Sequence, residues 1–488
     1  MDKDVKLLIL GFGLGLDNRE RDNTSCPYFY KSGLDPYGMA LDLADRMCYT
    51  GYRTKILNGK ERKFMSNPVT FAICGCGNRG LEAYAPYQEQ HPDEMRVVAG
   101  ADHRPERLAV LHQRYSVPEE HCFVSDLELL AQPRLADVMI VATQDRQHVT
   151  DALLALDKGY HVLLEKPISP SLEECRALQK KAHETGRAVV VCHVLRYTRF
   201  YSALKELLDR GEIGKIETID AVEHVAYWHH AHSFVRGNWR RSDETSPMIL
   251  AKSCHDMDIL RWLAGAECRK VQSFGALDYF RVECAPEGAA LRCLDGCKCK
   301  TACPYDAEKI YITDPRTGIR GKGKGWPCGV VASEPTEEKL MEALRTGPYG
   351  RCVFHCDNDV VDHQTVNLEF ANNIHATFTM TAFTQSCHRT IKVTGTAGDV
   401  EGDMEEEKLV IHRFGWPEQV IDLREEGGEF SGHGGGDFGL MRSFCKLIAS
   451  GGTEGLTGVD ASVESHVMAL AAEASRRDGG RTVELSEF

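Results

Sequence analysis

The stretch from residue 69 to residue 102 constrains the fold of this chain more than any other. An apolar run, "VTFAIC" (69–74), leads into the glycine-rich turn "GCGNRG" (75–80). A second apolar run, "MRVVAGAD" (95–102), ends at Asp102. A strand, a G-x-G-x-x-G turn, a helix and a second strand ending in an acid are the parts of a dinucleotide-binding βαβ unit. The segment therefore predicts the start of a doubly wound, Rossmann-type parallel sheet.

The same turn supplies candidate cofactor contacts. Glycines at 75, 77 and 80 allow a sharp turn and bring backbone N–H groups against a pyrophosphate, with Asn78 and Arg79 between them. A carboxylate at Asp102 accepts from ribose hydroxyls and repels a 2′-phosphate, which favours NAD over NADP. Arg104 lies close by and keeps NADP as the alternative. Pro86 is expected to shorten or kink the first helix.

A second glycine-rich stretch, "LLILGFGLGLD" (7–17), competes for the same role. Leu16 takes the place of the third glycine, and polar residues follow where a helix should begin. We therefore assign the cofactor to Gly75, Gly77 and Gly80, and interpret residues 1–64 as an N-terminal extension. Two interpretations stay open: Met65 marks a dispensable or mis-assigned start, or residues 38–51 form a small helical flank.

From 120 to 195 the chain alternates apolar runs with amphipathic, helix-like segments, which completes a predicted domain over 66–195. In a doubly wound sheet the ligand lies at the carboxyl ends of the strands. Beyond the first two strands, the polar residues at or just after such ends are Thr143, Gln144, His148, Glu165 and Lys166. We expect all five to contact the cofactor.

Composition excludes several classes of partner. The 488-residue chain carries a formal net charge of −14, which repels phosphate backbones and anionic lipids, so neither nucleic acid nor a membrane is an expected partner. No apolar run reaches the length of a bilayer span. Nineteen cysteines, many of them in apolar runs, favour a reducing cytoplasm.

Four stretches in order, "GCGNRG", "ATQDRQH", "LLEKPIS" and "SCHDMDILRWL", resemble the glucose–fructose oxidoreductase and inositol dehydrogenase (Gfo/Idh/MocA) family. The resemblance covers about residues 66–488. It implies that a C-terminal α/β domain (196–488) with a large, open, mostly antiparallel sheet follows the Rossmann domain. It also implies a nicotinamide-dependent enzyme acting on a sugar or polyol, a cis bond between Lys166 and Pro167, and a homodimer or homotetramer.

The resemblance places two residues at the reaction. Lys166 would reach both the nicotinamide and a substrate hydroxyl, and His255 would accept the hydroxyl proton. Many members carry an aspartate four residues before this histidine, where this chain has Ala251 followed by Lys252. A cation at Lys252 suggests a substrate with an acidic group. The other expected substrate contacts are Asp258, His232, Arg236, Trp239 and His363. The stretch 223–241 could also be an ordinary surface loop.

Three functions stay open from sequence. The first is net oxidation or reduction of a sugar or polyol hydroxyl. The second is a glycosidase that recycles its NAD through oxidation, elimination, hydration and reduction. The third is a sugar- or nucleotide-sensing protein without catalysis.

A cysteine-rich segment, "RCLDGCKCKTACPYDA" (292–307), lies in a predicted insertion over about 283–350. Thiolates at Cys293, Cys297 and Cys303 are expected to bind a structural zinc ion, with Cys299 nearby and Cys328, Cys352 or Cys356 as a remote ligand. The alternatives are no metal, adventitious disulfides and, less favoured, an iron–sulfur cluster. The insertion is expected to lack a core of its own. C-terminal helices are predicted within about 433–478.

Overall fold

The computed structural model describes residues 67–424 and 434–488. The expectations for residues 1–64, including the glycine-rich stretch at 7–17, lie outside the described residues.

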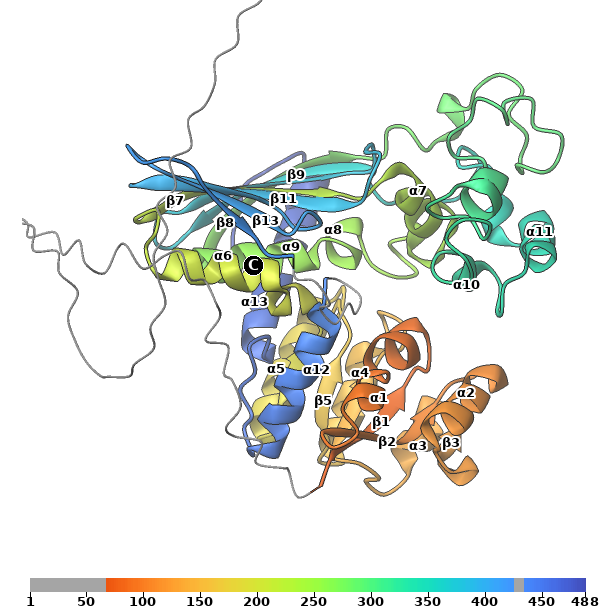
Figure 1. The fold of residues 1–488 in the computed structure, drawn as a ribbon, viewed down its shortest axis with the longest axis horizontal. Helices are drawn as coiled ribbons and strands as arrows, with labels where there is room; N and C mark the ends of the chain where they lie inside the picture. The colour runs from red at the N-terminus through yellow and green to blue at the C-terminus, as the bar shows by residue number, and fades with distance from the viewer. Residues whose placement is uncertain (1–66, 425–433) are drawn as a thin grey trace, which may run out of the picture. The chain divides into compact units, whose positions relative to one another are not determined.

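A six-stranded sheet forms the first domain, in the order β3-β2-β1-β4-β5-β6, and each pair of neighbours is parallel (Figure 1). This is the predicted doubly wound sheet. Its strands are β1 Val69–Cys74, β2 Met95–Ala101, β3 Cys122–Phe123, β4 Val138–Val141, β5 His161–Leu164 and β6 Val189–Val191. The connecting helices are α2 Pro105–Tyr115, α3 Asp126–Ala131, α4 His148–Asp157 and α5 Leu172–Thr185.

The glycine turn after β1 is built as its sequence predicts. Gly75 has a φ of +89°, and a Cβ there would lie 2.4 Å from the carbonyl oxygen of Ala142. A Cβ on Gly80 would lie 2.4 Å from the carbonyl oxygen of Gly75. After the turn the chain forms a π-helical segment (Asn78–Tyr84) and the short helix α1 (Tyr87–Gln90), with Pro86 at the junction. Pro86 thus interrupts the first helix, as expected.

The second domain contains a nine-stranded sheet in the order β14-β13-β12-β11-β7-β10-β9-β8-β15. Only the β7–β10 pair is parallel, so the sheet is mixed and mostly antiparallel, as predicted. Side chains of β9 alternate between exposed and buried, which is typical of a strand with one face on a core. The strands are β7 Ile216–His224, β8 Cys268–Ala276, β9 His363–Phe370, β10 His375–Thr381, β11 His388–Gly395, β12 Gly398–Asp403, β13 Lys408–Arg413, β14 Gln419–Asp422 and β15 Val483–Glu484.

Helices α6 (Arg199–Asp209), α9 (Cys254–Ala264) and α13 (Val459–Arg477) lie along one face of this sheet (Figure 1). Their apolar side chains join those of the strands in one core. Helix α12 (Gly436–Ala449) instead packs against β1, and its Phe438, Met441 and Phe444 belong to the core of the first domain. The C-terminal part of the chain therefore contributes to both cores.

The insertion occupies the connection between β8 and β9, residues 277–362, and includes α10 (Cys328–Val331) and α11 (Glu337–Thr346). The expectation that it lacks a core is wrong. Aromatic side chains, among them Phe280, Tyr305 and Tyr311, pack with Leu344 in a buried cluster. A smaller cluster surrounds Leu340.

Within the described residues, no helix has both the length and the apolar character that a membrane span requires.

Candidate active site

Lys166 and the segment that carries His255 meet in the structure. Lys166 follows β5, its bond to Pro167 is cis, and its Nζ donates to the carbonyl oxygen of Ala251 at 2.9 Å. Ala251 ends the short helix α8 (Met248–Ala251), and α9 begins at Cys254. His255 is therefore the second residue of α9, close to the bond that Lys166 makes.

His255 is 5% exposed and packs edge-on against His193, with ring centroids 5.7 Å apart. His193 follows β6, so it too stands at the carboxyl edge of the parallel sheet. Neither ring nitrogen of His193 has a hydrogen-bond partner among the described residues. Burial lowers the pKa of His193 well below its usual value, and the cations Arg196 and Lys166 lower it further. The imidazole is thus neutral beside both predicted catalytic residues.

Sequence analysis missed His193. The signal was a polar residue at the end of "VVVCH", the last strand of the first domain. A histidine just after a buried strand carries no functional signal of its own. Only the packing of His255 against it, which the sequence does not show, makes His193 part of the site.

Glu165 holds the glycine turn to the neighbouring strand end. Its carboxylate accepts from the Arg79 guanidinium at 2.6 Å and from the Tyr84 hydroxyl, and Arg79 also pairs with Asp437 at 2.7 Å. Burial raises the pKa of Glu165, but Arg79 and Lys166 outweigh it, and the pKa lies below its usual value. The side chain of Arg79 is thus occupied by ion pairs within the protein. The backbone N–H groups of the glycine turn remain to bind a pyrophosphate.

At the end of β2, Asp102 is 7% exposed and accepts from the backbone N–H of Arg104 at 3.0 Å and from its Nε at 3.1 Å. A Cβ on Gly77 would meet only Arg104, at 3.8 Å. Asp102 and Arg104 therefore flank the turn where the adenosine ribose of a dinucleotide would lie.

Two further predicted contacts hold the loops at the strand ends. The Thr143 hydroxyl donates to Asp151 at 2.8 Å. The His148 ring nitrogens lie 2.7 Å from the carbonyl oxygen of Pro167 and 3.2 Å from that of Thr143. His148 is buried and joins the loop after β4, which also carries Gln144, to the loop after β5.

Lys252 belongs to a buried charge network. Its Nζ lies 3.1 Å from a carboxylate oxygen of Glu223, which is fully buried and also pairs with Arg389. Arg389 in turn pairs with Asp256 at 2.9 Å, and burial raises the pKa of Asp256 to about 6. The charge of Lys252 is thus already compensated by Glu223.

Asp258 is not open to a substrate. It is fully buried, and its carboxylate accepts two hydrogen bonds from the guanidinium of Arg196, at 2.6 and 2.7 Å. Arg196 also lies over the ring of Trp262, 5.4 Å from its centroid. The buried Arg196, in the segment Val194–Tyr197 that follows β6, thus takes both carboxylate oxygens of Asp258, and neither oxygen is left open for the expected substrate contact.

The remaining substrate candidates lie in three places. Trp239 donates to Asp145, which follows β4, at 3.3 Å, so it lies at the carboxyl edge of the parallel sheet. His232 and Arg236 are buried in contact with the insertion: His232 lies 2.9 Å from the Tyr311 hydroxyl, and Arg236 donates to the carbonyl oxygen of Tyr305 at 2.7 Å. His363 is half exposed at the start of β9 and lies 2.7 Å from Asp362.

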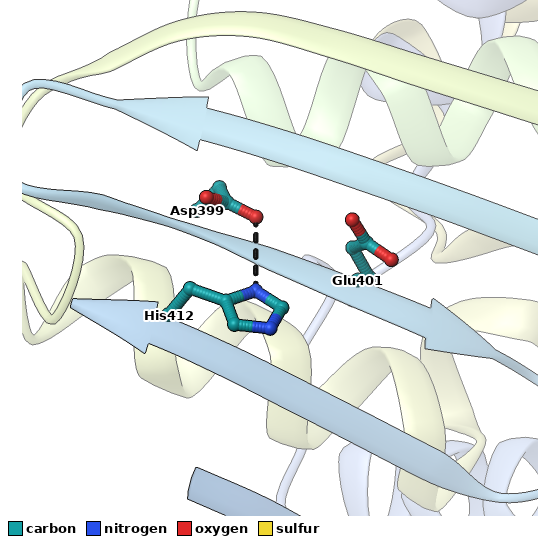
Figure 2. Close-up of side chains that lie close together, drawn as sticks. All are labelled: Asp399, Glu401 and His412. Carbon is teal, nitrogen blue, oxygen red and sulfur yellow. Dashed lines mark hydrogen bonds and ion pairs between the residues drawn. The ribbon is translucent and has the colours of Figure 1, made fainter. Parts of the chain in front are cut away.

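One group of three potential metal ligands, Asp399, Glu401 and His412, has its ligand atoms within 4.8 Å of one another in the part of the chain that the structure describes. Figure 2 shows these side chains on β12 and β13. Lys392 pairs with both carboxylates, at 3.4 and 2.5 Å, and His412 also contacts Glu418. The ammonium of Lys392 thus already compensates the two carboxylates of this group.

A parallel sheet with a glycine turn after β1, an acid after β2 and a lysine after β5 defines a nucleotide-binding domain of the dehydrogenase type. The chain matches the family model of the Gfo/Idh/MocA oxidoreductases with NAD-binding Rossmann fold over residues 69–193. It also matches the model of their C-terminal alpha/beta domain over 205–485. The chain belongs to the Gfo/Idh/MocA oxidoreductase family and is an enzyme of that family.

Relatives support the same assignment. The chain is 25% identical to the putative oxidoreductase YteT of Bacillus subtilis, over 75% of this chain and 86% of YteT. It is 30% identical to the scyllo-inositol 2-dehydrogenase (NAD(+)) of B. subtilis over 31% of this chain and 41% of that protein. It is 26% identical to the 2,7-anhydro-N-acetylneuraminate hydratase of Mediterraneibacter gnavus over 42% of this chain and 52% of that protein. This chain thus matches about half or less of the length of the inositol dehydrogenase and of the hydratase.

A solved structure shares the fold. An inositol dehydrogenase homolog from Azotobacter vinelandii, complexed with NAD+, superposes with a TM-score of 0.62 at 16% identity, covering 88% of this chain and all of that one.

Proposed function

We propose that this enzyme transfers hydride between NAD and a hydroxyl-bearing carbon of a neutral sugar or polyol. The observation that carries the proposal is the bond from Lys166 to the carbonyl oxygen of Ala251, four residues before His255. The bond sets the ammonium at the cofactor edge of the first domain against the short helix of the second domain that precedes His255.

The residues present fit the cofactor. A Cβ on Gly77 would meet only Arg104, at 3.8 Å, so the backbone there is open to a pyrophosphate, and the nearby Asp102 suits an adjacent ribose. When bound, the nicotinamide ring supplies the hydride acceptor or donor. Lys166 would orient the substrate hydroxyl and stabilise negative charge on its oxygen. His255 would hold the hydroxyl proton, and its ring is positioned by the edge-on contact with His193.

A neutral substrate follows from the ion pairs. Lys252 suggested an acidic group on the substrate, but Glu223 lies 3.1 Å from its Nζ. A substrate carboxylate would therefore have to compete with a buried carboxylate that already pairs with Lys252. We propose Lys252 as a positioning residue for the segment that carries Lys166's acceptor and His255.

The test is His255→Ala, with His375→Ala, an exposed histidine of β10, as the matched control. Loss of a general base lowers turnover by about 100- to 10,000-fold. We expect that loss at His255 with an NAD affinity changed less than about threefold, and no change at His375. Unchanged turnover at His255 would refute the mechanism.

Redox-neutral cleavage is the second candidate, because relatives named 2,7-anhydro-N-acetylneuraminate hydratase occur among the matches. A panel of polyols and glycosides followed for both NADH and released aglycone separates the two reactions. Net NADH supports the first proposal, whereas aglycone without net NADH supports the second. Ligand binding without either product would support a sensing protein.

We further propose a homodimer or homotetramer in a reducing cytoplasm. Phe414 and Trp416, each 65% exposed, and Val420 lie at the β13–β14 edge of the open sheet, where a second copy would cover them. Every cysteine in the described residues is a free thiol, as a reducing compartment requires. Light scattering of the purified chain would measure the assembly.

A further inference from the structure

A small cavity in the insertion is lined by thiols from distant parts of the chain. Its volume is about 20 Å³. The cysteines around it are Cys293, Cys297, Cys299, Cys303 and Cys352. All are free thiols, and Cys293 and Cys352 are buried. The cavity takes no part in the hydride transfer proposed above.

The backbone holds two of these cysteines side by side. The N–H of Cys293 donates to the carbonyl oxygen of Gly350 at 3.0 Å, and the N–H of Cys352 donates to that of Leu291 at 2.9 Å. These bonds surround an antiparallel bridge between Arg292 and Arg351. Cys352 is thereby fixed against the start of the cysteine-rich segment, although it lies far along the chain.

A buried cation faces the same cavity. Arg236 is 1% exposed and lines the cavity, with Nη2 3.6 Å from the Cys293 sulfur. Its Nε donates to the carbonyl oxygen of Arg351 at 2.7 Å, whereas Nη1 has no hydrogen-bond partner among the described residues. Neutral thiols do not compensate a buried guanidinium, since a charge in that position needs a negative partner.

We infer that this cavity binds one zinc ion through the thiolates of Cys293, Cys297, Cys303 and Cys352, with Arg236 as the buried counter-cation. Four thiolates around Zn²⁺ carry a net charge of −2, which the guanidinium partly offsets. In the structure no three of these sulfurs lie within 4.8 Å of one another, so the ion would draw them inward.

The other cysteines fit less well. Cys328 is buried outside the cavity, where its thiol contacts the carbonyl oxygens of Tyr311 and Thr317, each at 3.4 Å. Cys356 donates to the carbonyl oxygen of Cys352 and does not line the cavity. Cys299 donates to the carbonyl oxygen of Glu287 at 3.2 Å.

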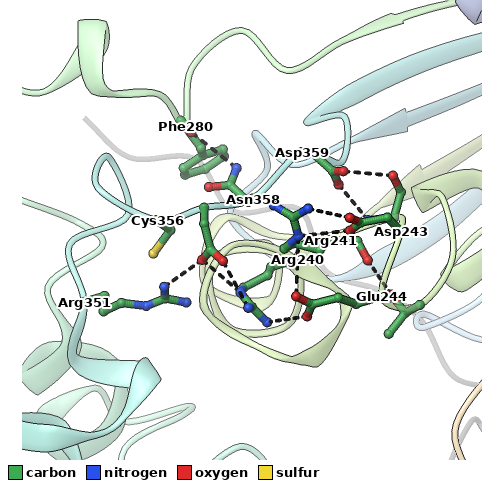
Figure 3. Close-up of polar contacts among 12 residues, drawn as sticks. Arg240, Arg241, Asp243, Glu244, Phe280, Arg351, Cys356, Asn358 and Asp359 are labelled. Atoms are coloured by element: carbon green, nitrogen blue, oxygen red, sulfur yellow. Dashed lines mark hydrogen bonds and ion pairs between the residues drawn. The ribbon is translucent and has the colours of Figure 1, made fainter.

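A polar network fixes the chain on both sides of the site. Arg240 and Arg351 both pair with Asp357, at 2.9 and 2.7 Å. Figure 3 shows Arg351 and Cys356 beside Arg240, Arg241 and Asp359, which join the end of the insertion to the segment that follows Arg236. A zinc ion would in addition cross-link Cys352, near the end of the insertion, to the cysteine-rich segment near its start.

The experiment measures metal in the purified full-length chain by mass spectrometry, with Cys352→Ser as the variant and Cys328→Ser as the matched control. We expect about one zinc per chain in the native protein and in Cys328→Ser, and a loss of at least tenfold in zinc content in Cys352→Ser. Zinc below a tenth per chain, iron in its place, or full zinc retention in Cys352→Ser would overturn the proposal.

Cobalt substitution of the native chain tests the site without relying on a variant that folds poorly. A tetrahedral site of four thiolates gives intense visible bands and sulfur-to-cobalt charge transfer. The weak bands of an octahedral oxygen-ligated ion would refute the assignment. Since these readouts use neither NAD nor substrate, their failure would leave the proposed oxidoreductase activity untouched.

Discussion

Replacing Asp258 by Asn separates a structural role of this residue from a role in substrate binding. The carboxylate is fully buried and receives two short hydrogen bonds from Arg196, which is itself 4% exposed. The amide would keep the shape of the side chain but remove its charge, and the Arg196 guanidinium would remain buried without a counter-charge.

Breaking a buried pair in this way costs about 3–5 kcal/mol. For a domain of this size each kcal/mol lowers the melting temperature by about 2–4 °C, so we expect a fall of about 6–20 °C. Glu464→Gln is the matched control, because Glu464 pairs with Arg261 of the same helix at 2.7 Å but both side chains are about one-quarter exposed. That change should cost at most about 1 kcal/mol.

The assay is thermal unfolding followed by fluorescence, together with NAD titration of the folded protein. A second variant, Arg196→Met with Asp258→Leu, removes both charges and should recover most of the lost stability. An unchanged melting temperature in Asp258→Asn would refute the reasoning, because a buried guanidinium that has lost its counter-charge must destabilise the fold.

Two further predictions concern the cofactor and acid stability. Asp102→Ser should weaken NAD binding about tenfold, which corresponds to about 1.4 kcal/mol. The same change should improve NADP binding, because Arg104 is released from the carboxylate. Titration with both dinucleotides measures these affinities, and tighter binding of NADP than of NAD by the native chain would contradict the prediction. Burial lowers the pKa of His230 to about 4 and of His232 and His466 to about 3. Below about pH 6.5 the three histidines are therefore protonated in the unfolded chain but not in the folded chain. The free energy of unfolding should fall as the pH drops from 6.5 to 4, by up to about 4 kcal/mol per pH unit for three protons. A melting temperature that stays constant over this range would show that these rings are not buried in neutral form.

Local sequence features predicted the first domain well, because a Rossmann unit is built from short-range patterns. Apolar runs of strand length, the spacing of Gly75, Gly77 and Gly80, and the interruption at Pro86 all act within a few residues of where they stand. The position of Lys166 at a strand end also follows from such a pattern. The sheet of the second domain came from resemblance, since antiparallel strands far apart in the chain leave weaker local signals.

The sequence by itself determined which residues carry charge, and only the tertiary structure decided which charges are already paired. Lys252 and Asp258 are charged residues that were both predicted to contact substrate. In the folded protein Glu223 pairs with Lys252 and Arg196 pairs with Asp258, each from another element, so both charges are compensated. Likewise Cys352 joins the cysteine-rich segment only through a backbone bridge formed on folding. Pair formation depends on the approach of distant segments, and Coulomb energy falls with distance in space, which the order of residues along the chain does not specify.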